Sequence, residues 1–102
     1  MATTERVQAY GRVIKTVDEL AGVKLHPDEQ QIVREAADAL IFCEDLSRDH
    51  EAEDALGRLY ELVDRLVESD RLLPETARQL VADVEACAPA RIAQGAGSAR
   101  GG

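Results

Sequence analysis

Apolar residues recur every three or four positions along four stretches of the chain, and this spacing predicts four amphipathic helices. The predicted helices cover residues 4–21, 27–46, 50–67 and 74–88. Gly22 follows the first helix in a usual stop position, and prolines open the second and the fourth. No stretch alternates apolar and polar residues as a half-buried strand would. The pattern predicts an all-α fold.

The predicted inward faces contain only aliphatic residues, alanine, cysteine and tyrosine. They comprise Val7, Tyr10, Val13, Ile14, Val17, Leu20 and Ala21, then Ile32, Val33, Ala36, Ala37, Leu40, Cys43 and Leu46, then Ala52, Ala55, Leu56, Leu59, Tyr60, Val63, Leu66 and Val67, and finally Ala77, Leu80, Val81, Val84 and Cys87. We therefore expect a core without Asp, Glu, Lys, Arg or His.

Short connectors join the predicted helices, which favours an up-down four-helix bundle made of two helical hairpins. The connectors of the two hairpins contain a similar sequence motif, Leu-x-Pro-acid: Leu25-His26-Pro27-Asp28 in the first and Leu72-Leu73-Pro74-Glu75 in the second. The apolar positions of the first and third helices also coincide after a shift of forty-six residues. Duplication and chance helical phasing both explain this similarity. The alternative architecture is an open arrangement that a second copy completes.

The length of 102 residues suits one domain. We expect residues 1–88 to form the bundle and residues 89–102 to form a flexible tail, because the tail is rich in Ala, Gly and Ser and has no helical period.

The formal net charge of −8 makes direct binding to nucleic acid or to an anionic membrane surface unexpected. An acidic surface suits solubility or a basic protein partner. The first residues lack a basic stretch followed by an apolar run, so we expect no secretory signal and a cytoplasmic location.

The stretch LIFCEDLSRDHEAED, residues 40–54, gathers a cysteine, a histidine and six carboxylates. It lacks the paired Cys or His of a zinc site, the central glycine of an EF-hand and the Glu-x-x-His pairs of a di-iron bundle. His26 and His50 are isolated histidines, which we expect to be solvated. The sequence predicts no metal site and no cofactor.

Cys43 and Cys87 lie near the ends of the second and fourth helices, which run in the same direction in an up-down bundle. We expect two buried, unreactive thiols at the same end of the molecule. A disulfide is the alternative.

Phe42 differs from its neighbours because it falls on the acidic outward stripe of the second helix. A lone aromatic residue ringed by acids can be a partner anchor. The equal alternative is that the following loop or the tail folds back and covers it. The candidate partner-contact residues are Phe42, Ile41, Glu44, Asp45, Asp38 and Glu35.

The sequence contains no phosphate-binding loop, nucleophile elbow or Cys/His dyad, and we predict no catalytic residues. We favour a small acidic protein–protein interaction or regulatory module. One alternative is an enzyme or small-molecule-binding bundle whose pocket is gated by Tyr10 and Tyr60. The other is a structural subunit that forms a homodimer or larger assembly through Val33, Ala37 and Ile41.

Overall fold

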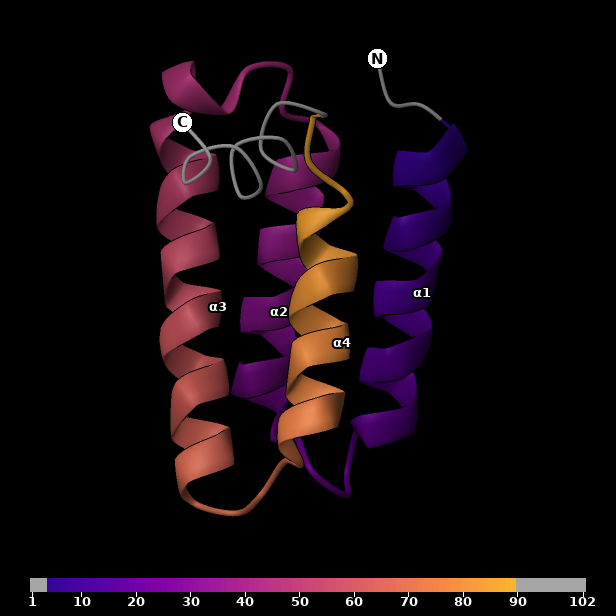
Figure 1. Cartoon of the computed structure of the whole chain (residues 1–102), viewed down its shortest axis with the longest axis vertical. Helices are drawn as coiled ribbons and strands as arrows, with labels where there is room; N and C mark the ends of the chain where they lie inside the picture. Colours follow the sequence, from indigo (N-terminus) through magenta and orange to yellow (C-terminus); the bar gives the residue numbers. More distant parts are fainter. Residues whose placement is uncertain (1–3, 90–102) are drawn as a thin grey trace.

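The computed structural model describes residues 4–89 of the chain, and these residues form four α-helices and one short 3-10 helix (Figure 1). The elements are α1 (Thr4–Leu20), α2 (Pro27–Ile41), η1 (Leu46–Arg48), α3 (His50–Glu68) and α4 (Pro74–Glu85). The predicted tail from residue 90 onward lies outside the described residues. Within the described part, no segment forms a strand, and the all-α prediction is confirmed.

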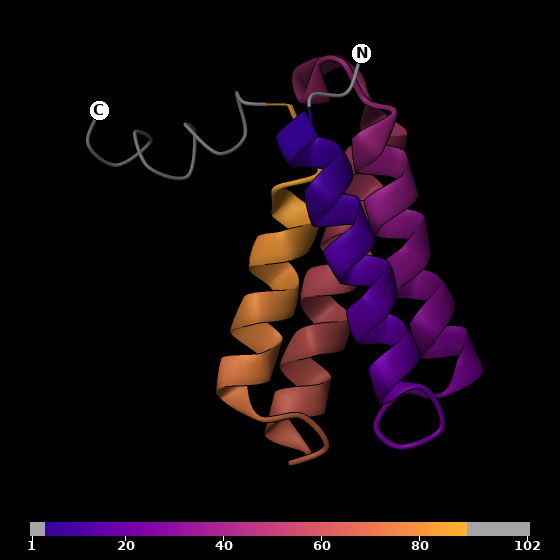
Figure 2. The ribbon, with the colours of Figure 1, turned by 90° about the vertical axis from the view of Figure 1, so that its right-hand side faces the viewer.

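The helices run alternately up and down, so α1 and α3 begin at the end of the bundle where α2 and α4 finish (Figure 1). We call this the upper end and the opposite one the hairpin end, because the α1–α2 and α3–α4 connectors lie there. Figure 2 shows α1 beside α2, with α4 next to α1 at the upper end. α2 packs against all three other helices. The predicted up-down four-helix bundle is confirmed.

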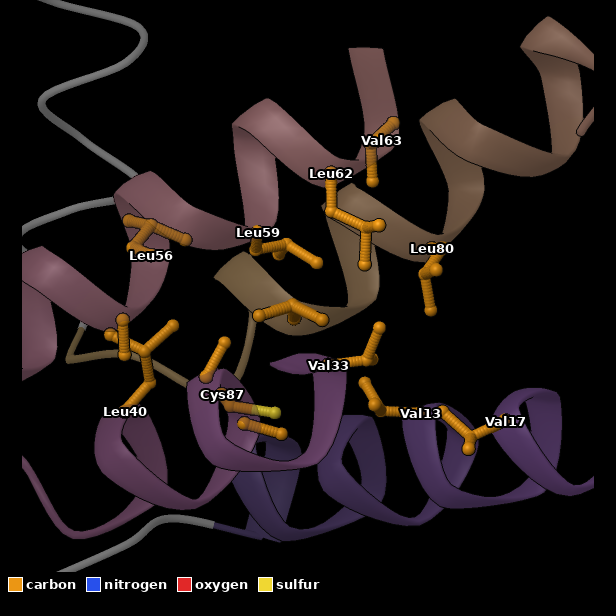
Figure 3. Close-up of a cluster of buried hydrophobic side chains, with 14 of the residues drawn as sticks. Val13, Val17, Val33, Leu40, Leu56, Leu59, Leu62, Val63, Leu80 and Cys87 are labelled. Atoms are coloured by element: carbon orange, nitrogen blue, oxygen red, sulfur yellow. The ribbon is translucent and has the colours of Figure 1, made fainter. Parts of the chain in front are cut away.

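The core is aliphatic along most of its length. Figure 3 shows side chains from α3 and α4, such as Leu59, Leu62 and Leu80, meeting Val13 and Val33 from α1 and α2. Each of these five side chains is at most 1% exposed. Burying a side chain of this size contributes about 1.5–3 kcal/mol, so the aliphatic interior is the main source of stability.

One leucine of each hairpin connector is buried against the core at the hairpin end. Leu25 is 1% exposed and Leu72 is 3% exposed, and each is followed two residues later by the proline that opens the next helix. The similar Leu-x-Pro-acid phrases therefore occupy equivalent places in the two hairpins.

The helix ends at the hairpin end use backbone conformations that glycine favours. Gly22 follows α1 with a φ of 75°. Asp70 follows α3 with a φ of 61°, and the next amide, that of Arg71, donates to the carbonyl of Leu66 at 2.9 Å. Together with the bond from the Asp70 amide to the Val67 carbonyl, this is a Schellman motif. An L-residue with a side chain is strained in the left-handed region, so Asp70 carries a cost that Gly22 does not.

An arginine ties the two hairpin connectors together. Arg71 donates two hydrogen bonds to the Glu29 carboxylate, at 2.8 and 2.6 Å, and one to the Lys24 carbonyl at 2.9 Å. Glu29 also accepts the His26 amide at 2.8 Å, which caps the start of α2. The hydrogen bonds from Arg71 are the largest cause that lowers the pKa of Glu29, to about 2. Glu29 is therefore held as a carboxylate in the folded state.

Two buried charged side chains contradict the prediction of a core without Asp, Glu, Lys, Arg or His. Arg6 is 8% exposed and Asp83 is 5% exposed. Asp83 accepts from Arg12 at 3.0 Å and from Gln79 at 3.2 Å, so α1 and α4 are joined by an ion pair beside the core. Both buried charges have partners, which is the condition for tolerating them.

The face of α2 that suggested self-association is largely occupied within one chain. Val33 and Ala37 are fully buried and Ile41 is half-buried. α2 needs this wide apolar face because it packs against α1, α3 and α4 at once. The width of the face is thus explained by packing within one chain. Whether the chain self-associates stays a prediction.

We expect Asp70→Gly to raise the free energy of unfolding by about 0.5–1 kcal/mol, because it relieves the left-handed strain after α3. Gly22→Ala should lower it by a similar amount for the converse reason. Urea denaturation of the two variants measures both effects. A destabilised Asp70→Gly variant would show that the aspartate side chain stabilises this turn by more than its strain costs.

We expect Glu29→Gln to destabilise the protein at neutral pH and to have progressively less effect as the pH falls from about 4.5 to about 2. The pKa of Glu29 is about 2 in the folded chain, whereas its ordinary value is 4.5. The ionised Glu29 therefore makes its full contribution to the free energy of unfolding above pH 4.5, and this contribution is lost as the pH falls toward about 2. Unfolding midpoints measured across this range test the expectation. Glu19→Gln removes one exposed carboxylate from α1 as a control. A constant difference at every pH would contradict the proposed ion pair.

Candidate functional site

Phe42 is the most exposed of the large apolar residues in the described part of the chain, at 84%. It occupies the C-cap of α2, with φ −93° and ψ −3°. The loop to α3 turns inward directly after it, because Cys43 is 2% exposed and Leu46 packs against the core. The loop therefore does not cover Phe42. The tail, which the sequence offered as the other possible cover, lies outside the described residues.

The predicted end of α2 at Leu46 is wrong: the helix ends five residues earlier, at Ile41. The cause is the guanidinium of Arg6, which is far away in the sequence. Its Nη2 donates to the carbonyls of Leu40 at 2.7 Å, of Ile41 at 3.2 Å and of Cys43 at 2.8 Å. In a continuing helix, each of these carbonyls would accept a hydrogen bond from the backbone amide of the next turn. Because Arg6 supplies a donor instead, the helix can end here without leaving the carbonyls unpaired.

Arg6 also reaches the end of α4, where its Nε donates to the Cys87 carbonyl at 2.7 Å. The C-terminal ends of α2 and α4 thus share one buried cation. Carbonyl groups at helix C-termini carry partial negative charge, so a guanidinium is favourable there. Its fork of N–H donors can satisfy several acceptors from one side chain. This arrangement fixes the backbone on both sides of Phe42.

The sequence interpretation missed Arg6 because the apolar pattern was traced from Val7. A signal was present, since Arg6 continues the buried row of α1 through Ala9, Val13 and Val17. An arginine at the inward position of the first helical turn is a candidate for bonding to neighbouring helix ends. Val7, which was predicted to be inward, is 55% exposed because Arg6 occupies the inward place.

The register of α1 against α2 places Val7 and Phe42 at the same height of the bundle. One turn below them, the Tyr10 hydroxyl donates a hydrogen bond to Asp38. Val7 precedes Tyr10 by three residues and Phe42 follows Asp38 by four, so in antiparallel helices both lie one turn nearer the upper end. α1 and α2 lie side by side there (Figure 2). We call Phe42, Val7 and the exposed part of Tyr10 the Phe42 patch.

The other candidate contact residues surround this patch unevenly. Glu35, Asp38 and Glu44 are exposed, and Ile41 and Asp45 are half-buried. Asp38 accepts from Tyr10 and Glu35 accepts from Gln31, so both carboxylates are held in place on the outer side of α2. Asp45 lies 3.9 Å from Arg48 in the following loop. Of the predicted residues, Asp38 contacts the Phe42 patch directly through Tyr10, and Glu35 lies farther along the same helix. Val7 and Tyr10 are additions to the predicted contact residues.

The two cysteines lie at the upper end, as predicted, because Arg6 bonds to the carbonyls of both. Both are buried free thiols. Burial raises the pKa of Cys43 and raises that of Cys87 to about 11. The thiols are therefore protonated at neutral pH and poor nucleophiles.

The histidines are exposed, as expected: the side chains of His26 and His50 are 68% and 90% exposed, respectively. Among the described residues, nowhere do three or more His, Cys, Asp or Glu side chains group so that they could hold a metal ion.

The tyrosines lie at the boundary of the core and not inside it. Tyr10 is half-buried and Tyr60 is 38% exposed. Each donates its hydroxyl to a carboxylate of the neighbouring helix, Tyr10 to Asp38 and Tyr60 to Glu85. The hydrogen bond to Asp38 is the main cause that raises the pKa of Tyr10, whereas burial is the main cause for Tyr60. Both phenols are therefore fixed as neutral donors.

A groove of about 610 Å³ lies between α3 and α4 and is open to solvent. Its apolar lining comprises Tyr60, Val63, Val67, Pro74, Ala77, Val81 and Ala82. Its charged lining comprises Asp64, Glu68, Glu85 and Arg78. Pockets for small ligands usually enclose most of the ligand surface, and an open groove of this kind suits an elongated partner better.

Comparison with known proteins finds no protein family, no curated protein and no solved structure that matches the chain. Between residues 4 and 89, every helix is too short or too polar to cross a bilayer.

We expect Arg6→Met to lower the free energy of unfolding by about 3 kcal/mol or more, because it leaves several buried carbonyls without their charged donor. Arg6→Lys should recover part of the loss, since an ammonium group lacks the planar fork. Arg58→Met, an exposed change on α3, should cost less than about 0.5 kcal/mol. Urea denaturation compares the three variants. A loss below about 1 kcal/mol in Arg6→Met would contradict the structural role given to Arg6.

Proposed function

We propose that this protein is a small acidic helical module that binds another protein through the Phe42 patch and does not itself catalyse a reaction. The observation that carries the proposal is the 84% exposure of Phe42 together with the 55% exposure of Val7 on the adjacent helix. We propose that it acts in the cytoplasm, where its two free thiols would stay reduced.

The Phe42 patch has the composition of an interface centre. Aromatic residues are enriched in binding hot spots, and a phenylalanine that becomes buried on binding contributes about 1.5–3 kcal/mol from its apolar area. The ring stands on a backbone that Arg6 holds through the carbonyls of Ile41 and Cys43. A partner would therefore spend little conformational entropy on ordering this site.

The border of the patch favours a partner with a basic surface. Glu35, Asp38 and Glu44 are exposed on and just beyond α2, and the chain as a whole carries a net charge of −8. Charges at an interface rim steer the encounter and set the orientation more than they add affinity. The same charge argues against nucleic acid or an anionic membrane as the partner.

The alternatives have less support. Catalysis needs convergent titratable groups in a site that excludes water. Among the described residues, the buried charged side chains, Arg6 and Asp83, are engaged in hydrogen bonds that hold helices together. Self-association through α2 would need apolar residues that α2 already buries inside the bundle. A homodimer through the Phe42 patch is a distinct case, and a mass measurement in solution separates it from binding to another protein.

We expect Phe42→Ala to weaken binding to the physiological partner by about 2 kcal/mol or more, as for a hot-spot residue, while the free energy of unfolding changes by less than about 0.5 kcal/mol. Affinity capture from the native host with the wild-type protein and with Phe42→Ala identifies the proteins whose capture depends on Phe42. Titration of the purified candidate then measures the loss.

Leu73→Ala is the matched control, because Leu73 is 70% exposed at the opposite end of the bundle. It should leave capture unchanged. Equal capture by wild type and Phe42→Ala would rule out the Phe42 patch as the binding site. A large loss of stability in Phe42→Ala would show that the ring packs against the protein itself.

A further inference from the structure

We propose that the groove between α3 and α4 is a second docking surface, which binds one amphipathic helix of another protein with basic residues along its flanks. This surface is separate from the Phe42 patch. α3 and α4 form it, whereas the patch belongs to α1 and to the end of α2, so either proposal can fail alone.

The lining of the groove has the spacing that a docked helix requires. Its apolar lining follows helical spacing on both sides, through Tyr60, Val63 and Val67 on α3 and through Ala77 and Val81 on α4. Side chains at such spacing form ridges between which the ridges of a third helix can pack. Ala82 is small and exposed, so it leaves room for a neighbouring backbone beside α4, whereas Ala77 is 3% exposed and belongs to the core. A strand is not a suitable occupant, because two helices offer no sheet edge to extend.

The length of the groove sets the length of the guest. The lining residues on α4 extend from Pro74 to Glu85, which is the whole of that helix. Twelve residues of α-helix rise about 18 Å, so the groove accommodates about three turns of a guest helix. Such a guest presents apolar residues at positions i, i+3 or i+4, and i+7.

The charges beside the groove select a cationic guest. Asp64, Glu68 and Glu85 are acidic, and Arg78 is the single basic residue among those that line the groove. Tyr60 donates its hydroxyl to Glu85, which holds that carboxylate at the upper end of the groove. Lys or Arg on the flanks of a guest would pair with these carboxylates, and acidic flanks would be repelled.

The test is a displayed library of helical peptides, each about 14 residues long and therefore about 21 Å as a helix, selected against the purified full chain. Aliphatic residues occupy the i, i+3, i+4 and i+7 positions, and the flanking positions vary among Lys, Glu, Ser and Gln. We expect selection to enrich peptides with Lys on both flanks. Peptides without a charge preference, or no enrichment above the starting library, would overturn the proposal.

Matched variants locate the binding site. Ala82→Lys adds a cation at an exposed position in the groove and should weaken the selected peptides about tenfold, whereas Gln8→Lys adds the same charge on α1 and should leave them unchanged. Arg78→Gln should tighten their binding, because it removes a like charge. An equal effect of Ala82→Lys and Gln8→Lys would show that only net charge matters, and sensitivity to Phe42→Ala alone would assign the peptides to the other surface.

A sedimentation measurement addresses a second copy as the occupant. We expect the wild-type protein and Ala82→Lys to sediment with the same oligomeric state. A dimer that Ala82→Lys converts to a monomer would show that the groove binds another copy of this chain, and would overturn the choice of a cationic helix.

Discussion

The bundle depends on how the C-terminal ends of two helices that run in the same direction are satisfied. α2 and α4 end next to each other, and their last carbonyl groups face the interior, where water cannot serve as donor. Arg6 provides the donors for both ends, through the carbonyls of Leu40, Cys43 and Cys87. Burying a cation alone costs free energy, and so does burying a carbonyl without a donor. Here the Arg6 guanidinium and the helix-end carbonyls bond to each other, which offsets both costs.

A second arginine has a comparable position at the opposite end. Arg71 joins the two hairpin connectors through Glu29 and the Lys24 carbonyl. Between these ends the packing is aliphatic, which is strong but not directional. The hydrogen bonds of Arg6 and Arg71 therefore determine which helix ends meet and the register of the helices along the bundle axis. The leucines and valines provide most of the stability. Arg12 and Asp83 add a third polar link beside the core.

Local signals predicted the parts of the fold that depend on neighbouring residues. Pro27 and Pro74 mark the starts of α2 and α4. The structure adds Asp49 as the cap of α3, where its side chain accepts the Ala52 amide at 3.0 Å. The end of α2 could not be found in this way, because a residue more than thirty positions away determines it. The exposure of Val7 follows from the same contact. Helical periodicity marks a face, but it does not tell which residue of the first turn points inward.

The exposure of Phe42 is not explained by packing. Its backbone must lie where it does, since Arg6 fixes the carbonyls on both sides and Cys43 turns into the core. The C-cap position itself makes no demand on the side chain, and a polar residue would serve there without exposing a ring to water. The loop that follows could have covered the ring but buries Cys43 instead. Arg6 holds the backbone on both sides of an outward aromatic ring, and this preorganisation supports the binding site that we propose.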